Sequence, residues 1–416
     1  MGEQRNTVGK VIVTGAEEHQ GLAVIRGLGL RGVPVVACGS KRQSLGFYSR
    51  FATERHVYTS PFADERRFVA DILRIARASG AALILPSVES TLVVLDAHRA
   101  ELEPGCRLGA PDSATLEAAI DKVRTLELAE QLGIPVPRTA HGTSHSAILA
   151  AAKGLRFPVA IKPRGHQLYG KTRNALGFKV KYAATLDQLA AALPTLEPNG
   201  VYPLIQEYAS GIGICVSALF DRGRPVVLFP YARVREVPLT GGISVLRRSL
   251  PLDARLKTYV ERLLGALRWH GIAMIEFRYN ARTDSFVLIE INARFQASTA
   301  LSLDAGLNLP YLVYALYTGG TLDDSYSYRT GVEERWLRGD VLSLLAALVG
   351  ETQRSSVPDA ERPLPSRARL VRDFLRDFRP GMKYDEFKLY DLRPAAIECL
   401  ELGRAVFDFA RSWIRR

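Results

Sequence analysis

Residues 273–279, AMIEFRY, and residues 288–295, LIEINARF, are two apolar runs that each carry a glutamate and are joined by the turn-forming sequence NARTDS. If the chain turns back at Thr283, Glu276 and Glu290 stand directly opposite each other in an antiparallel hairpin. Opposed residues project from the same face, with Cβ atoms about 5 Å apart. Two bare carboxylates so placed repel each other, and their apolar neighbours suggest partial burial, which is unfavourable for an unpaired charge. We therefore expect a bound cation between them.

The second run adds polar groups to the same face, because Glu290, Asn292 and Arg294 alternate along it. Mg²⁺ prefers oxygen ligands and is usually held by one or two carboxylates together with substrate phosphates. An arginine beside it can neutralise charge on a transferring phosphoryl group. The combination therefore predicts a site for a metal and a polyphosphate. Salt-bridged glutamates on an edge hairpin, or a general acid–base pair, are the alternatives, and the acid–base pair leaves Asn292 and Arg294 unexplained.

The first 110 residues alternate apolar strand-like runs with helical stretches. The strand-like runs are KVIVT (10–14), VPVVAC (33–38) and AALILP (81–86). Apolar strands between amphipathic helices predict a doubly wound parallel sheet, whose ligands lie beyond the carboxyl ends of the strands. Two loops, 14–21 and 86–91, fall at such ends and are either ordinary turns or supports for a substrate. The first does not spell GxGxxG, so no dinucleotide site is predicted.

The middle of the chain carries lysines at element ends. A helix predicted from about Ser113 to Leu132 contains Asp121-Lys122, and Gly133 and two prolines stop it. The strand-like FPVAIK (157–162) precedes a polar stretch rich in glycine and cations, which suits phosphate. The strand-like VYPLIQEY (201–208) follows a further helix.

The bulk composition bounds the class of protein. The chain has 416 residues, 47% hydrophobic and 24% charged, which predicts a globular protein of two or three domains. It contains no run of roughly 18 apolar residues and no signal-peptide core, so we expect a cytoplasmic protein without stable membrane insertion. Its four cysteines are scattered, as in a reducing cytosol. The net charge of +12 is spread along the chain without a basic stripe, so no nucleic-acid partner is expected.

The order of these motifs resembles the ATP-grasp superfamily. The likeness runs over roughly residues 10–325 through DK, LGIPVP, FPVAIKP, the glycine-containing loop, QEY, MIEF and LIEINARF. It is closest to the carboxylate–amine ligase type, related to biotin carboxylase and to the synthetase halves of carbamoyl-phosphate synthetase. The resemblance implies an N-terminal α/β domain (1–112), a two-subdomain α+β ATP-grasp fold (113–325) with a lid at about 135–207, and a mainly helical C-terminal extension (326–416).

The resemblance also implies which residues hold ATP and its metal. Lys122 and Lys162 match two lysines that contact nucleotide phosphates. The hinge strand that meets adenine corresponds to Gln206, Glu207 and Tyr208, with Glu207 as the polar contact. The lid loop corresponds to residues 165–172, including Gly165, Gly170 and Lys171.

Metal and substrate roles follow in the same way. The ligands of Mg²⁺, or of Mn²⁺ in its place, correspond to Glu276, Glu290 and Asn292, and Arg294 corresponds to the phosphate-facing arginine. Arg235 and the segment 241–247, which contains Arg247, resemble the part that meets the acyl phosphate or an acidic substrate. Where the family commonly has proline, an aromatic residue and glycine, this chain has Ala293, Gln296 and Ala297.

The implied activity is that of an ADP-forming ligase. It would use ATP to activate a carboxylate as an acyl phosphate and then couple it to an amine, so the expected partners are small-molecule carboxylates and amines. A bicarbonate-dependent carboxylase or carbamate-forming enzyme is one alternative, and a non-catalytic nucleotide-binding regulator is another. For the C-terminal extension, the alternatives are that it caps the substrate site, forms a homodimer or touches a membrane.

Overall fold

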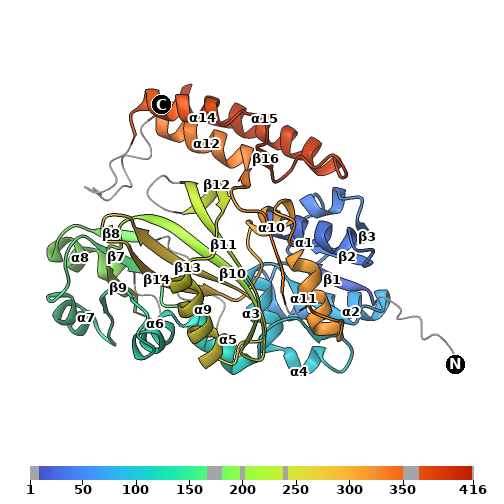
Figure 1. Ribbon diagram of the computed structural model, residues 1–416, viewed down its shortest axis with the longest axis horizontal. Coiled ribbons are helices and arrows are strands. Elements are labelled where there is room, and N and C mark those ends of the chain that lie inside the picture. The colour runs from blue at the N-terminus through green and yellow to red at the C-terminus, as the bar shows by residue number, and fades with distance from the viewer. Residues whose placement is uncertain are drawn as a thin grey trace.

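A parallel sheet forms the N-terminal part of the protein in the computed structural model, which describes residues 9–165, 180–196, 202–237, 242–323, 325–349 and 365–414 (Figure 1). Its strand order is β3-β2-β1-β4-β5. The strands are β1 (Val11–Thr14), β2 (Val35–Gly39), β3 (Ala52–Val57), β4 (Leu83–Pro86) and β5 (Arg107–Leu108). Strands β1, β2 and β4 are buried along their whole length, which is why they read as continuous apolar runs.

Helices connect these strands and complete the predicted doubly wound arrangement. They are α1 (His19–Gly29), α2 (Glu65–Ser79), α3 (Glu89–Ala97) and α4 (Arg99–Leu102), with a 3-10 turn, η1 (Leu45–Tyr48). The order reverses between β1 and β4, so the loops that follow these two strands meet. Ser87 Oγ donates to the carbonyl of Thr14 at 2.6 Å, and the hydroxyls of Thr14 and Thr91 lie 2.7 Å apart.

The largest sheet has seven strands in the order β14-β13-β10-β11-β12-β15-β16. They are β10 (Ile212–Asp221), β11 (Arg224–Val237), β12 (Ile243–Ser249), β13 (Gly271–Asn280), β14 (Ser285–Asn292), β15 (Glu333–Arg335) and β16 (Lys383–Tyr384). All neighbouring pairs are antiparallel except β15 with β16. Helices α9 (Ala254–Ala266), α10 (Thr299–Asp304) and α11 (Leu309–Thr318) pack against it.

A smaller four-stranded sheet, ordered β6-β9-β7-β8, lies to one side of the central sheet (Figure 1). It consists of β6 (Thr139–Ala140), β7 (Val159–Lys162), β8 (Lys181–Ala183) and β9 (Leu204–Glu207), with α7 (His145–Ala152), α8 (Leu186–Ala192) and the 3-10 turn η3 (Leu193–Thr195). One hydrophobic cluster, between Ala140 and Ile205, belongs to this unit alone. The unit therefore has its own core, within the range predicted for a lid.

The single helix predicted from Ser113 to Leu132 is wrong in one respect, because Asp121 divides it. The structure has α5 (Ser113–Ile120) and α6 (Lys122–Gln131). Asp121 has an extended backbone and accepts hydrogen bonds from the amides of Val123 and Arg124. An aspartate in this role caps a helix N-terminus, so α6 starts anew there.

The C-terminal extension contains helices α12 (Leu337–Leu348), α14 (Arg367–Arg376) and α15 (Arg393–Ile414), which lie together along one edge of the molecule (Figure 1). It is mainly helical, as expected, but it also supplies β15 and β16 to the central sheet. Buried Arg26 of α1 donates to Asp391 and to the backbone carbonyls of Asp385 and Glu386. The extension is therefore joined to both the central sheet and the parallel-sheet unit.

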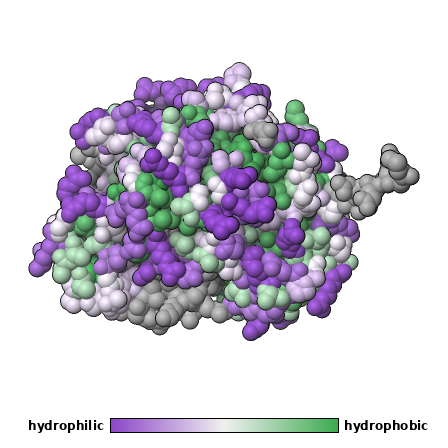
Figure 2. Space-filling view, turned by 60° about the horizontal axis from the view of Figure 1, so that its bottom comes forward, coloured by the Kyte–Doolittle hydropathy of each residue, from purple (hydrophilic) through white to green (hydrophobic). Residues whose placement is uncertain are grey.

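Hydrophilic residues cover most of the face shown in Figure 2, with hydrophobic residues in separate patches between them. Of the helices in the described part of the chain, none combines the length and apolar character needed to cross a bilayer.

Candidate active site

A pocket of about 410 Å³ lies between the small sheet and the central sheet. Its lining includes seven of the residues predicted to form a nucleotide site: Lys122, Lys162, Gln206, Glu207, Tyr208, Glu276 and Glu290. These residues come from α6, β7, β9, β13 and β14 and from the residue after β9. The structure therefore brings together positions that are up to 168 residues apart, from Lys122 to Glu290, in the sequence.

The carboxylate hairpin has the predicted pairing of the two glutamates, but its turn lies at a different position from the predicted one. Glu276 pairs with Glu290 across β13 and β14. Nearer the turn the pairs are shifted by one residue, as in Phe277 with Leu288, which leaves Ile289 as an extra residue on β14. The turn is therefore not centred on Thr283, and a β-bulge restores the opposition of the two glutamates. Bulges of this kind are common next to active sites, where they re-aim a side chain.

Arg233 neutralises Glu276. The Glu276 side chain is buried, and its two oxygens accept from Arg233 at 2.6 and 3.0 Å. Burial and the facing Glu290 raise the pKa of Glu276, while Arg233 acts in the opposite direction. Glu236 forms ion pairs with Arg233 and Arg278, and both arginines line the pocket. The sequence reasoning missed these two arginines, because their carboxylate partners lie on other strands or beyond a bulge.

Glu290 forms an ion pair with a lysine and accepts a hydrogen bond from an amide. Its Oε2 lies 3.3 Å from Lys122 Nζ, and its Oε1 accepts from Asn292 Nδ2 at 2.9 Å. Burial opposes ionisation, but Lys122 and the Asn292 bond outweigh it and hold the pKa of Glu290 well below its usual value. Burial likewise lowers the pKa of Lys122, but Glu290 and Glu89 outweigh it and raise the pKa overall. Both groups are therefore charged at neutral pH.

Lys162 projects from the end of β7 into the same pocket. Its Nζ donates to Gln206 Oε1 at 2.5 Å, and Gln206 Nε2 donates to the hydroxyl of Thr139. Burial lowers the pKa of Lys162 to about 8, because nearby Glu290 and Glu276 only partly offset the loss of hydration. An anion that enters the pocket would therefore stabilise the protonated form of this lysine.

The hinge strand β9 is held by charge pairs at its end. Both oxygens of the buried Glu207 are engaged by Arg156, and Oε1 also lies 3.3 Å from Arg138. The carboxylate predicted to meet adenine is thus already neutralised. The next residue, Tyr208, makes an edge contact with Tyr182 at 5.9 Å between ring centroids, and both rings line the pocket. Two aromatic rings in edge-to-face contact therefore form part of the pocket lining.

The Asp121-Lys122 motif also anchors the start of the predicted lid loop. Asp121 accepts from Arg164 at 2.8 to 3.1 Å, and the amide of Lys122 donates to the carbonyl of Arg164. Gly165 follows Arg164 as the last described residue there. The predicted lid residues Gly170 and Lys171 lie outside the described residues, as does Gly241 of the predicted substrate segment.

Arg294 lies next to Asn292, as the alternation predicted. Its Nη2 donates to Asn292 Oδ1 at 3.4 Å, and its Nε lies 3.9 Å from a carboxylate oxygen of Glu89 on α3. The residue therefore connects the hairpin with the start of α3. Neither Asn292 nor Arg294 contributes to the lining of the 410 Å³ pocket itself.

Arg235 and Arg247, which were expected to meet the acyl phosphate or an acidic substrate, do not line this pocket. The register shifts on both sides of Arg235 break the alternation with Arg233, and Arg235 instead pairs with Asp340 and Asp377 at 2.7 and 2.8 Å. Arg247 is 1% exposed and pairs with Glu334 and Asp385 at 3.1 Å. Both arginines hold the C-terminal extension in place.

The donor set around the hairpin fits a hard divalent cation. Two opposed carboxylates and an amide are the oxygen ligands that Mg²⁺ or Mn²⁺ takes, with substrate phosphates completing the shell. Each of the two like charges has its own cation: Arg233 lies 2.6 Å from Glu276, and Lys122 lies 3.3 Å from Glu290. A cation between the carboxylates would relieve their repulsion and free the arginine and lysine for phosphate oxygens.

The chain is similar in sequence to two ligase-type enzymes. It is 23% identical over 226 residues to the carbamoyl phosphate synthase large chain of Clostridium acetobutylicum, covering 53% of this chain and 20% of that one. It is 25% identical over 243 residues to the N5-carboxyaminoimidazole ribonucleotide synthase of Synechococcus elongatus, covering 57% of this chain and 58% of that one. The matches thus span well under two thirds of these relatives. No protein-family model matches the chain.

Solved structures of biotin carboxylases share its fold. The biotin carboxylase–β-γ-ATP complex of Campylobacter jejuni has a TM-score of 0.62 and 15% identity, over 78% of this chain and 74% of that one. The biotin carboxylase domain dimer of Hydrogenobacter thermophilus 2-oxoglutarate carboxylase, with MgADP, ADP and bicarbonate, has a TM-score of 0.61 and 17% identity over 78% and 73%. The mixed fold of one parallel and two antiparallel sheets therefore matches biotin carboxylase. The similarity to ATP-grasp enzymes of the carboxylate–amine ligase type is confirmed.

Proposed function

We propose that this protein is an ADP-forming ligase that binds ATP with Mg²⁺ in the 410 Å³ pocket, converts a carboxylate into an acyl phosphate, and couples it to an amine. One observation carries the proposal. Glu276 and Glu290 face each other across a bulged hairpin, and Lys122, Lys162 and Arg233 surround them in one pocket. The similarity to a carbamoyl phosphate synthase chain and to a carboxyaminoimidazole ribonucleotide synthase supports this assignment.

The pocket's own groups bind and orient the nucleotide. Lys122 and Lys162 supply positive charge to the phosphates, and Tyr182 and Tyr208 line the end of the pocket at the hinge strand. Glu276, Glu290 and Asn292 would hold Mg²⁺, which when bound neutralises phosphate charge and polarises the terminal phosphoryl group. Arg294 lies beside this set, between Asn292 and Glu89 at the start of α3.

The reaction proceeds in two displacements. A substrate carboxylate oxygen attacks the γ-phosphorus, and the bond from that phosphorus to the β–γ bridging oxygen breaks, which releases ADP. The amine nitrogen then attacks the acyl carbon, the bond to the phosphate oxygen breaks, inorganic phosphate leaves, and the nitrogen gives up a proton. The protein's part is positioning and charge neutralisation, which can supply most of the rate.

The finer layout belongs to the same proposal. Residues 1–112 form the N-terminal domain, residues 113–325 the ATP-grasp part with a lid at about 135–207, and residues 326–416 the extension. The separate core of the lid unit supports this division. Arg233, which pairs with Glu276, is added to the proposed set beside the metal ligands. Cytoplasmic location and a homodimer stay predictions.

Hydroxylamine trapping with an ADP-release screen tests the function. Purified protein, Mg·ATP and hydroxylamine are incubated with panels of carboxylates, and in parallel with carboxylate and amine pairs. We expect a hydroxamate and a matching release of ADP with at least one carboxylate, and we expect both to be abolished in Glu290→Ala. No ADP and no hydroxamate with every acid, although ATP binds, would indicate the nucleotide-binding regulator.

The same assay with bicarbonate as the acid distinguishes the carboxylase alternative from the ligase. Bicarbonate-dependent ADP release that no organic carboxylate reproduces would favour it over the ligase. The fold match to biotin carboxylase is compatible with both outcomes.

A further inference from the structure

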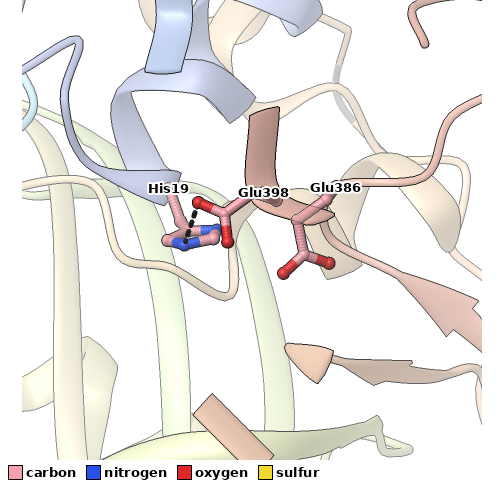
Figure 3. Close-up of side chains that lie close together, drawn as sticks. All are labelled: His19, Glu386 and Glu398. Carbon is pink, nitrogen blue, oxygen red and sulfur yellow. Dashed lines mark ion pairs between the residues drawn. The ribbon is translucent and has the colours of Figure 1, made fainter. Parts of the chain in front are cut away.

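A second cluster of ligand-type side chains lies outside the nucleotide pocket. It comprises His19 at the start of α1, Glu386 in the loop after β16, and Glu398 on α15 (Figure 3). One ligand atom from each of them lies within 4.8 Å of the others. None of the three lines the 410 Å³ pocket. The cluster therefore joins the first helix of the chain to its C-terminal extension.

The bonding capacity of this cluster is unmet among the described residues. Glu386 is 1% exposed, and neither of its carboxylate oxygens has a hydrogen-bond partner there. Both ring nitrogens of His19 also lack a hydrogen-bond partner among the described residues. The nearest carboxylates, those of Asp385 and Glu398, lie 3.8 Å away. A buried polar group left without a partner is strongly unfavourable, and a buried carboxylate more so. Such groups point to a missing ligand.

The surrounding charges leave Glu386 without a cation of its own. Arg338 Nε lies 2.8 Å from Glu398, while Arg247 is taken by Asp385 and Glu334. Burial and the neighbouring Asp385 raise the pKa of Glu386 to about 8. Burial lowers the pKa of His19 to about 4, so its ring is neutral at pH 7 and keeps a lone pair for a metal. The cluster thus offers an imidazole and two carboxyl groups.

The backbone holds these side chains in position. Arg26, two turns after His19 on α1, donates to the carbonyl of Glu386 at 3.0 Å and to Asp391 at 2.8 Å. The Trp336 ring packs beside that of His19 in a tilted contact, with 4.9 Å between the ring centroids. Ligands fixed in this way bind a metal with little loss of conformational freedom. Zinc bonds of about 2.0–2.2 Å place ligand atoms roughly 3–4 Å apart, so only small side-chain rotations are needed.

We propose that His19, Glu386 and Glu398 bind one divalent transition-metal cation, Zn²⁺ or Mn²⁺, which fastens the C-terminal extension to the parallel-sheet unit. One imidazole and two carboxylates suit both ions, and the neutral imidazole favours a metal over an ammonium group. The site is distinct from the nucleotide-associated metal and does not depend on the proposed ligase activity.

The test uses the full-length chain, stripped with a chelator and dialysed, without nucleotide. Separate calorimetric titrations with Zn²⁺, Mn²⁺ and Mg²⁺ are expected to show uptake of one equivalent of Zn²⁺ or Mn²⁺ and a rise in melting temperature. Glu290→Gln is expected to keep this uptake, which separates the site from the nucleotide pocket. No uptake of either Zn²⁺ or Mn²⁺ would overturn the proposal.

Three variants localise the binding. Glu386→Gln is expected to abolish metal uptake and the thermal response, while the metal-free variant melts close to the metal-free wild type, because a pKa of about 8 keeps this buried carboxyl group largely protonated at pH 7. His19→Gln is expected to lose uptake as well. Glu401→Gln, three residues along the same helix as Glu398 and paired with Arg404, should bind like wild type. Unchanged uptake by Glu386→Gln, or binding of alkylammonium ions that metal does not displace, would contradict the assignment.

Discussion

Individual charges in the nucleotide pocket have defined partners that a ligand can exchange. Glu276 is paired with Arg233, and Glu290 with Lys122. A bound metal can take the place of Arg233 at Glu276 and of Lys122 at Glu290. Phosphate oxygens can then pair with the arginine and the lysine. The pocket is therefore organised for a charged ligand before the ligand arrives, which reduces the reorganisation needed during reaction.

Replacing Glu290 by Gln removes a proposed metal ligand with almost no change in shape. We expect kcat to fall by at least about 100-fold, because a group that stabilises developing charge contributes about 10²–10³ in rate. The apparent affinity for Mg²⁺ should fall with it, which a merely structural role would not cause. Steady-state ADP release against Mg²⁺ concentration measures both. Glu261→Gln on α9, outside the pocket lining, is the control, and equal activity in the two variants would contradict the role.

Because the pKa of Lys162 is lowered, we expect nucleotide binding to depend on pH. Its pKa is about 8 in the free protein, and phosphates should raise it. Binding above pH 8 must then take up a proton, and affinity should fall by up to about tenfold per pH unit as pH rises from 8. Below pH 7 this group is already charged and should cause no change. Calorimetry at pH 9 in buffers of different ionisation enthalpy measures the proton.

The matched controls for this linkage are two substitutions. Lys162→Met should bind ATP more weakly at pH 7 and show no proton uptake at pH 9. Lys153→Met, at an exposed position after α7, should behave as wild type. Proton uptake that survives in Lys162→Met would assign the titration to another group.

At the level of elements, the bulge in β14 and the break before α6 determine which side chains of the protein point into the pocket. The bulge at Ile289 aligns the two glutamates, and the break at Asp121 starts α6 with Lys122 at its first position. Asp121 also accepts from Arg164, just before the predicted lid loop. One side chain thus caps a helix and anchors a loop.

The Asp121→Ala variant should therefore affect both stability and nucleotide binding. Loss of a helix cap lowers the free energy of unfolding by about 1 kcal/mol. The variant should also raise the KM for ATP several-fold, because Asp121 holds Arg164 and starts α6 at Lys122, which lines the pocket. Denaturant unfolding and steady-state kinetics measure the two effects.

Asp253→Ala provides the comparison for Asp121→Ala. Asp253 caps α9 through the amide of Arg255 and pairs with its guanidinium. It lies outside the pocket lining, so the substitution should lower stability to a similar extent and leave the KM unchanged. Equal KM values for the two variants would show that Asp121 acts only as a cap.

On the scale of the whole molecule, the C-terminal extension is part of the folded body rather than an appendage. Arg26, Arg235 and Arg247 each reach from the rest of the chain to carboxylates beyond residue 326. These charges are largely buried, and a buried charge without its partner is strongly destabilising. The extension is therefore needed for the stability of the sheets it covers.

Asp391→Asn tests this role. Arg26 and Asp391 have side-chain exposures of 2% and 1%, so removing the carboxylate charge should lower the free energy of unfolding by about 3–5 kcal/mol. Asp373→Asn, whose arginine partners lie 3.6 Å away at 65% and 72% exposure, should change it by about 0.5 kcal/mol or less. Denaturant unfolding compares them, and similar values would mean that the buried pair contributes no more than a surface pair.

Much of this arrangement could be predicted from sequence, where local rules apply. Opposition of Glu276 and Glu290 follows from hairpin pairing, and the buried parallel strands follow from their apolar runs. The bulge that corrects the register leaves no clear signal in the sequence. The pairing of Arg235 with Asp340 and Asp377 could not be predicted, because these partners are over 100 residues away in the sequence. Such long-range pairing depends on the complete fold.

A crystal structure with Mn²⁺ and a non-hydrolysable ATP analogue tests the central claim most directly. We expect an anomalous metal peak bonded to carboxylate oxygens of both Glu276 and Glu290, with the triphosphate beside Lys122 and Lys162. Nucleotide bound elsewhere, or nucleotide in the pocket with no metal at either glutamate, would contradict it.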